Sequence, residues 1–161
     1  MRSNLKSGLR TVLGVTLLSA TLGAGAAQAG GVYDDTYSYW LYSNGWALFA
    51  GGPYSDAYNG TLHLTQIPGS VATFTCLDSQ AFQFFYTKAY NRGMFEVYLN
   101  GVKIGTYDGY SETLQRKTHL VPGGYYVGYR GNFNVTIKTL DAKNPASSGY
   151  FVDVDAIECS G

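Results

Sequence analysis

The sequence predicts an all-β fold, an antiparallel two-sheet β-sandwich (jelly roll) that follows a cleaved signal peptide. Aromatic residues, which pack well on a pleated sheet, are abundant, with 15 Tyr and 8 Phe. Short segments of alternating polarity recur along residues 30–161, with Gly, Pro and Asn turn signals between them. No segment of that range keeps the apolar period that a helix would need. These observations together favour short strands that close around one core.

The first 29 residues form a separate unit. A basic start precedes a mostly apolar run over residues 12–22, and the small residues of A-Q-A at 27–29 suit a signal peptidase. This pattern predicts a secretory signal peptide over residues 1–29 and a single β-sandwich domain over 30–161. The apolar run is shorter than the roughly 20 residues of a membrane span. We therefore expect a secreted, extracellular or cell-surface protein, or a periplasmic one, with no membrane span after cleavage.

The first half of the domain contains five expected strands. Residues 37–42 and 46–50 are rich in aromatic residues, and a G-G-P turn ends the second segment. Residues 61–66 alternate as T-L-H-L-T-Q, which places two leucines on one face. Residues 71–77 carry Phe and Cys on one face, and residues 81–87 carry three aromatic rings on one face.

The second half of the domain contains a hairpin and three further strands. Residues 95–99 alternate clearly, and Asn100-Gly101 predicts a type I′ turn into a returning strand over 102–107. A P-G-G turn ends the next segment, and a loop of turn-forming residues precedes the last one. These later strands are expected over residues 118–121, 133–140 and 150–158.

Cys76 and Cys159 are the two cysteines of the chain, and both lie in the predicted exported part. An even number of cysteines in an oxidising compartment favours a disulfide between them. Closing so long a loop stabilises a protein by about 2–4 kcal/mol, mainly by restricting the unfolded chain. The alternative is a pair of free thiols in the core.

Several motifs in a fixed order resemble a known family. The segments are Y-D-D-T at 33–36, Y-N-G-T-L-H at 58–63, V-Y-L-N-G at 97–101 and V-D-V-D-A-I at 152–157. Their order is similar to that of galactose-binding-like β-sandwich modules of exported bacterial and fungal proteins, which are related in shape to carbohydrate-binding modules. The resemblance implies a jelly-roll fold and a binding or structural role without catalysis.

Charge and residue types argue against nucleic-acid binding and against catalysis. The basic residues of the signal region leave acidic residues in excess over the rest of the chain, and no basic run exists there. His63 and His119 are the only histidines, and no serine lies in a nucleophile-elbow motif. No two carboxylates are spaced as a glycosidase pair. We therefore expect no enzyme and no nucleic-acid partner.

Glycan is the first candidate ligand of this exported, non-catalytic binding module. Sugars present apolar faces to aromatic rings and hydroxyl groups to polar side chains. The aromatic and polar residues that suit these contacts can instead belong to the core or to a solvated loop, and Trp46 in particular is of a residue type that is often buried. The candidate stacking residues are Trp46, Tyr54, Tyr90 and Tyr110, and the candidate polar contacts are Asn91, Arg92 and Asn144.

Two further expectations concern a metal and self-association. Asp35 and Asp155 would lie close together if the first and last strands are neighbours, and carboxylates suit a structural calcium ion. Alternatively, both accept internal hydrogen bonds. No other cofactor is expected. Tyr-rich stretches over 33–58 and 125–129 suit an interface, so the alternative function is a structural or self-assembling protein of the cell envelope or extracellular matrix.

Overall fold

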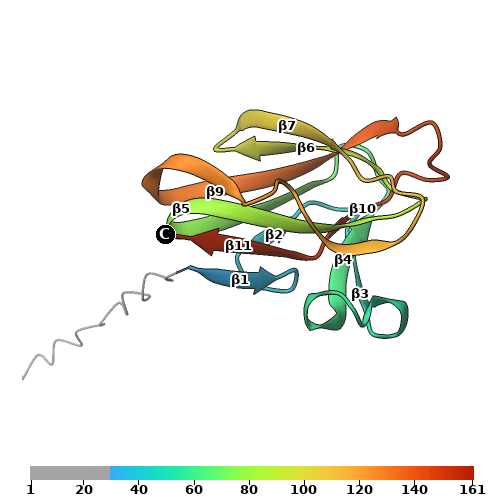
Figure 1. Cartoon of the computed structure of the whole chain (residues 1–161), viewed down its shortest axis with the longest axis horizontal. Coiled ribbons are helices and arrows are strands. Elements are labelled where there is room, and N and C mark those ends of the chain that lie inside the picture. The colour runs from blue at the N-terminus through green and yellow to red at the C-terminus, as the bar shows by residue number, and fades with distance from the viewer. Residues whose placement is uncertain (1–29) are drawn as a thin grey trace, which may run out of the picture.

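The computed structural model describes residues 30–161, which fold into two antiparallel β-sheets (Figure 1). The larger sheet has the strand order β1-β11-β5-β9-β6-β7, with β2 and β8 also paired to β5, and the smaller sheet has the order β10-β4-β3. The predicted all-β sandwich is confirmed, whereas the predicted signal peptide lies outside the described residues. The elements are β1 (Gly31–Asp34), β2 (Trp40–Tyr42), β3 (Ala47–Ala50), η1 (Gly52–Tyr54), η2 (Tyr58–Gly60), β4 (Thr61–Thr65), β5 (Val71–Lys88), β6 (Gly93–Leu99), β7 (Val102–Asp108), β8 (Gln115–His119), β9 (Tyr125–Lys143), β10 (Val152–Val154) and β11 (Ala156–Ser160).

The long strand β5 organises the larger sheet. The sequence predicts two strands here, but the chain continues through Asp78, which adopts a left-handed backbone with φ of 43°. The register with β9 shifts between Cys76 and Ser79, so the irregular residues are absorbed within one ladder. The two halves of β5 thereby meet different partners, β2 on the first half and β11 and β8 on the second.

The predicted hairpin at Asn100-Gly101 is confirmed. Both residues have positive φ, 48° and 81°, as a type I′ turn requires, and β6 pairs with β7 across it. The strand β9 begins earlier than expected, because Tyr125 and Tyr126 already pair with Phe82 and Ala81 of β5.

The last part of the chain passes from one sheet to the other. The sequence predicts one strand over 150–158, but β10 pairs with β4 in the small sheet and β11 pairs with β5 in the large sheet. The crossing occurs at Asp155, which is fully buried, and Asp153 just before it is 1% exposed. Two carboxylates are therefore placed inside the sandwich.

The main core lies against the large sheet and is rich in phenylalanine. Val152 and Val154 of β10 join it, and so link the two sheets. Burying each such side chain stabilises the fold by roughly 1.5–3 kcal/mol. A second, smaller cluster of Ala57, Leu62 and Leu64 packs with partly buried aromatic rings. The largest fully buried side chains of the main core are Phe74, Phe82, Phe84, Phe95 and Phe133.

The predicted disulfide between Cys76 and Cys159 is confirmed. It joins β5 to β11 in the core, with the two Cα atoms 5.7 Å apart and the two cysteines 83 positions apart in sequence. Within residues 30–161, no helix has the length and apolar character that crossing a membrane requires.

Candidate functional site

A groove with a volume of about 360 Å³ lies between β3, η1, β8 and the loop after β5. Tyr90 is 61% exposed and Leu114 is 55% exposed, so apolar surface faces solvent at this place. The rings of Phe49 and Tyr54 contact each other with their centroids 5.4 Å apart. We call this the aromatic groove, and it is lined by Phe49, Pro53, Tyr54, Leu64, Ala89, Tyr90, Asn91, Arg92, Leu114, Arg116 and Phe151.

One side of the aromatic groove is held by a buried ion pair. Arg92, which is 6% exposed, donates from Nε to Oδ2 of Asp153 at 3.0 Å, and its Nη2 lies 2.8 Å from the same oxygen in an ion pair. Its Nη1 donates to Oδ1 of Asn91 at 2.8 Å, and the other carboxylate oxygen of Asp153 accepts from the backbone N–H of Thr87 at 2.7 Å. The arginine predicted to contact a ligand therefore supports the loop that carries Tyr90 and Asn91.

The opposite side is held by Arg116, which the sequence analysis did not single out. Its Nη1 donates to Oγ1 of Thr87 and its Nη2 donates to the carbonyl of Pro53, both at 3.0 Å. Its Nε lies 3.2 Å from Oδ1 of Asp56, and its guanidinium lies over the ring of Tyr54 at 5.3 Å. These contacts fix η1 against β8. The polar stretch Q-R-K-T-H around it gives no sign of this role.

The other candidate binding residues lie near the groove or away from it. Tyr110 and Asn144 both bond to Asp108, the backbone N–H of Tyr110 to Oδ1 and the amide of Asn144 to Oδ2, each at 2.8 Å. Tyr110 also forms a backbone bridge with Ala89 of the groove. Trp46 lies elsewhere, partly buried against the main core, with its indole N–H donating to the carbonyl of Val71 at 3.1 Å. Of the predicted set, Tyr54, Tyr90, Asn91 and Arg92 line the aromatic groove.

Asp35 and Asp155 are brought together, as expected for the first and last strands. The backbone N–H of Asp35 donates to the carbonyl of Asp155 at 3.0 Å. The carboxylate of Asp35 is already bonded at both oxygens, to Oγ1 of Thr61 and Nδ1 of His63, each at 2.6 Å. One oxygen of Asp155 accepts from the backbone N–H of Tyr58 at 2.7 Å. Both aspartates thus act as internal hydrogen-bond acceptors in this arrangement.

The second oxygen of Asp155 is buried without a hydrogen-bond partner, as is one oxygen of Asp34. Burial raises the pKa of Asp155 to about 7, and burial also raises the pKa of Asp35. The unpartnered oxygens suit a cation, although among residues 30–161 no group of three or more His, Cys, Asp or Glu is placed to hold one. Structural calcium at Asp35 and Asp155 stays a prediction.

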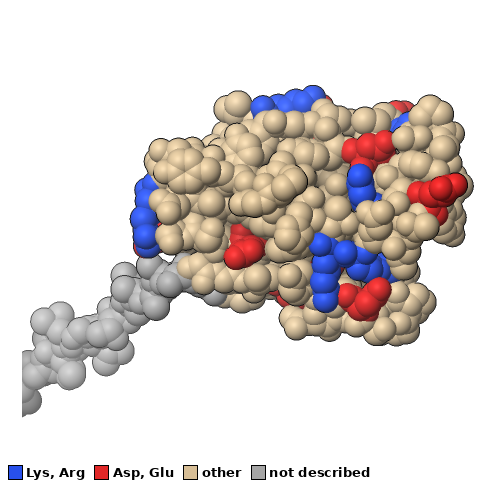
Figure 2. All heavy atoms as spheres, in the orientation of Figure 1, with Lys and Arg blue, Asp and Glu red and all other residues tan. Residues whose placement is uncertain are grey.

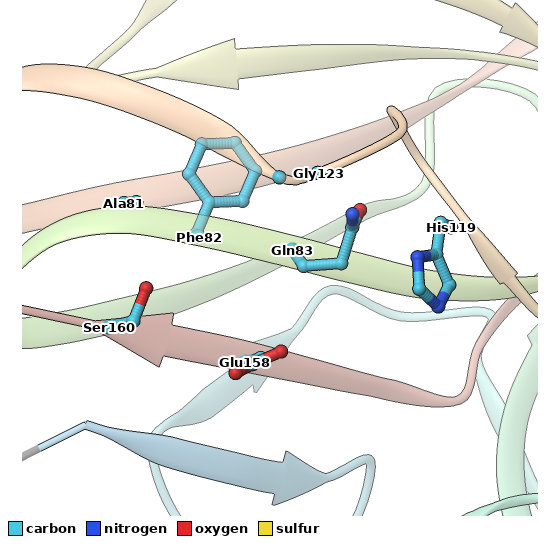
Figure 3. Close-up of a pocket in the computed structure, with 8 residues that line it drawn as sticks. Ala81, Phe82, Gln83, His119, Gly123, Glu158 and Ser160 are labelled. Atoms are coloured by element: carbon cyan, nitrogen blue, oxygen red, sulfur yellow. The ribbon is translucent and has the colours of Figure 1, made fainter.

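A second hollow of about 270 Å³ lies over β5 and β11 (Figure 3). Figure 3 shows Gln83 extending from β5 toward the turn at Gly123, with Glu158 and Ser160 on the neighbouring β11. The amide of Gln83 is used to hold that turn, because its oxygen accepts from the backbone N–H of Leu120 at 2.9 Å. The aromatic ring at this hollow, Phe82, is 1% exposed. This hollow therefore offers a sugar no exposed Phe, Tyr or Trp ring, and its exposed ring is the imidazole of His119.

Figure 2 shows blue and red side chains scattered singly or in small mixed groups, with uncharged surface between them. The whole sequence holds 11 basic and 11 acidic residues, but Arg2, Lys6 and Arg10 lie outside the described residues, so acidic residues are in excess over residues 30–161.

No protein-family model matches the sequence, and no curated protein matches it either. In three dimensions the chain is similar to parts of carbohydrate-active enzymes. A xanthan lyase from Paenibacillus has a TM-score of 0.65 and 16% identity, covering 85% of this chain and 14% of that chain. A two-domain esterase (CEX) active on acetylated mannans has a TM-score of 0.59 and 10% identity, covering 81% and 36%. The catalytic domain of a GH87 alpha-1,3-glucanase has a TM-score of 0.51 and 16% identity, covering 84% and 29%.

At these identities the likeness establishes the sheet-rich fold alone. This chain spans well under half of each of the three enzyme chains.

Proposed function

We propose that this protein is an exported, non-catalytic glycan-binding module and that the aromatic groove is its binding site. The exposed ring of Tyr90, set in a groove with other aromatic residues, carries the proposal. Sugar rings bury their apolar C–H faces on aromatic side chains, and polar groups at the edge then orient the hydroxyls. Asn91, beside Tyr90, supplies such a group.

Three observations support this proposal. The similar folds occur in enzymes that act on polysaccharides, which fits the resemblance to galactose-binding-like modules. The disulfide fits an oxidising compartment outside the cytoplasm. The residues that line the aromatic groove include no carboxylate, whereas glycoside hydrolysis by the common mechanisms needs two.

A glycan array followed by calorimetric titration tests the proposal. We expect Tyr90→Ala to weaken binding of the selected glycan about tenfold or more, since aromatic stacking is worth about 0.5–1.5 kcal/mol beyond the area it buries. Tyr126→Ala is the matched control, because Tyr126 is 66% exposed and pairs with Ala81 of β5, eight positions before the groove residue Ala89 in the chain. Equal loss in both variants, or no glycan bound at all, would contradict the proposal.

The alternative function, a structural or self-assembling protein, has one observation in its favour. Tyr126 and Tyr129 of the second Tyr-rich stretch are 66% and 44% exposed, and exposed tyrosines are enriched at protein interfaces. In the first stretch, Tyr33 is buried in the main core, whereas Tyr39 is 40% exposed. Light scattering over a concentration series tests this alternative. It would be favoured by oligomers that disappear in a Tyr126→Ser/Tyr129→Ser variant.

A further inference from the structure

We propose that the aromatic groove is built for an uncharged glycan, a neutral hexose chain, and selects against anionic polysaccharides. This inference rests on the proposed function and adds the chemical class of the ligand. It follows from the charges at the groove, where two arginines lie and neither is available to a ligand. Each arginine has its own carboxylate and its own set of hydrogen-bond acceptors.

Arg92 is neutralised inside the protein. Its Nε donates to Asp153, its Nη2 lies 2.8 Å from the same carboxylate oxygen, its Nη1 donates to Asn91, and the side chain of Asp153 is fully buried. A ligand carboxylate at the groove would find the charge of Arg92 already paired with Asp153. Because solvent does not reach Asp153, an incoming anion cannot displace it without leaving a buried charge unpaired.

Arg116 is neutralised at the other side. Its Nη1 and Nη2 are bonded to Thr87 and Pro53, its Nε faces Asp56, and its side chain is 9% exposed. The Nε atom is buried and makes no hydrogen bond within residues 30–161, so its contact with Asp56 is an ion pair only, and the guanidinium lies over the ring of Tyr54. An anionic sugar would therefore lose the hydration of its carboxylate at this place without gaining a free cation, and Asp56 would repel it.

The groups left to a ligand are uncharged. Besides the two paired arginines, no charged side chain lines the aromatic groove. Arg92 holds Oδ1 of Asn91, so the amide nitrogen of Asn91 is the group that remains free to donate to a sugar hydroxyl. Tyr90 and Leu114 add exposed apolar surface for the C–H face of a pyranose ring.

The experiment compares neutral and anionic polysaccharides on the full exported protein. Titrations with soluble glucan, galactan and mannan are set against xanthan, polygalacturonate and alginate, each at low and high NaCl. We expect the tightest ligand to be neutral, with a Kd that changes less than about twofold with salt, because screening acts on unpaired charges. Tyr90→Ala should weaken it about tenfold.

A gain-of-function variant tests the charge argument directly. Asp56→Asn removes the carboxylate beside Arg116 at a side chain that is 58% exposed, so the fold should tolerate it. We expect anionic glycans to bind several-fold more tightly to this variant, with little change for the neutral ligand. The control is Asp78→Asn, which frees Arg130 in an exposed pair on other elements, β5 and β9.

The outcomes separate this inference from the proposed function. If the tightest ligand is anionic, weakens at high salt and is lost in Tyr90→Ala, the groove binds glycan but the inference is wrong. It is also wrong if Asp56→Asn gains no more anionic binding than Asp78→Asn. If no glycan of either kind binds, the proposed function itself fails.

Discussion

The ion pair between Arg92 and Asp153 offers the sharpest test of how the aromatic groove is held. Arg92→Met keeps the apolar stem of the side chain and removes the guanidinium. The carboxylate of Asp153 then stays buried, with only the backbone N–H of Thr87 as a partner. Asp153→Asn makes the opposite change, because it leaves the guanidinium of Arg92 buried without a counter-charge.

Removing one member of a buried pair costs about 3–5 kcal/mol, because the remaining charge is uncompensated. We therefore expect each single variant to lose about that much unfolding free energy, a large part of the roughly 5–15 kcal/mol of a typical domain. The double variant Arg92→Met/Asp153→Asn leaves no charge at the position of this pair, and the Asn amide oxygen still accepts from Thr87. The double variant should lose less unfolding free energy than the sum of the two single-variant losses, by roughly 1.5–3 kcal/mol.

Urea unfolding followed by tryptophan fluorescence measures these values, since Trp40 is 6% exposed in the folded protein. A single variant that costs less than about 1 kcal/mol would refute the claim that the pair is closed to solvent. Strict additivity of the two single losses would refute the claim that the charges compensate each other.

The remaining predictions concern the buried aspartate, calcium and the disulfide. Burial raises the pKa of Asp155 to about 7, against about 3.9 in an unfolded chain, so the folded protein binds this proton more tightly. This difference in pKa adds to the free energy of unfolding in full below about pH 4, and the added stability is lost as the pH rises to about 7. This part of the free energy of unfolding is on the order of 2–4 kcal/mol. Because Asp155→Asn cannot titrate, its urea midpoint should fall less between pH 4 and 8 than that of the unaltered protein. If calcium binds at Asp35 and Asp155, added CaCl2 should raise the melting temperature above that in chelator, and an unchanged value would remove the prediction. Replacing both Cys76 and Cys159 by Ser should cost about 2–4 kcal/mol in urea unfolding, and a loss below about 1 kcal/mol would contradict the role assigned to this bond.

Local signals in the sequence predicted the features that depend on a few neighbouring residues. The turn at Asn100-Gly101 follows from two residues that tolerate positive φ, and the alternation on either side of it fixes the paired strands. The disulfide followed from an even cysteine count and the expected compartment. Neither required knowledge of distant contacts.

Features that depend on distant contacts could not be predicted in this way. The passage of the chain between sheets at Asp155 depends on pairing of β10 with β4 and of β11 with β5, which no local pattern records. The continuity of β5 through Asp78 likewise depends on β9 beside it.

In the candidate site too, local sequence identified some residues, whereas the roles of others depend on distant partners. Tyr90 and Asn91 were identified because an aromatic ring and an amide in a loop are typical of sugar binding. Arg92 and Arg116 have roles set by Asp153 and Asp56, partners 61 and 60 positions away in sequence, so residue type alone suggested a ligand contact for the first and nothing for the second.

The bond between Cys76 and Cys159 has a mechanical consequence. Tension applied to the C-terminal end reaches Cys159 two residues inward and passes covalently into β5, at the centre of the large sheet. The final strand cannot be unzipped from its neighbours while this link is intact. A load applied at Gly161 would thus be carried into β5 as well as β11, whereas under reducing conditions the same load would peel β11 away one hydrogen bond at a time.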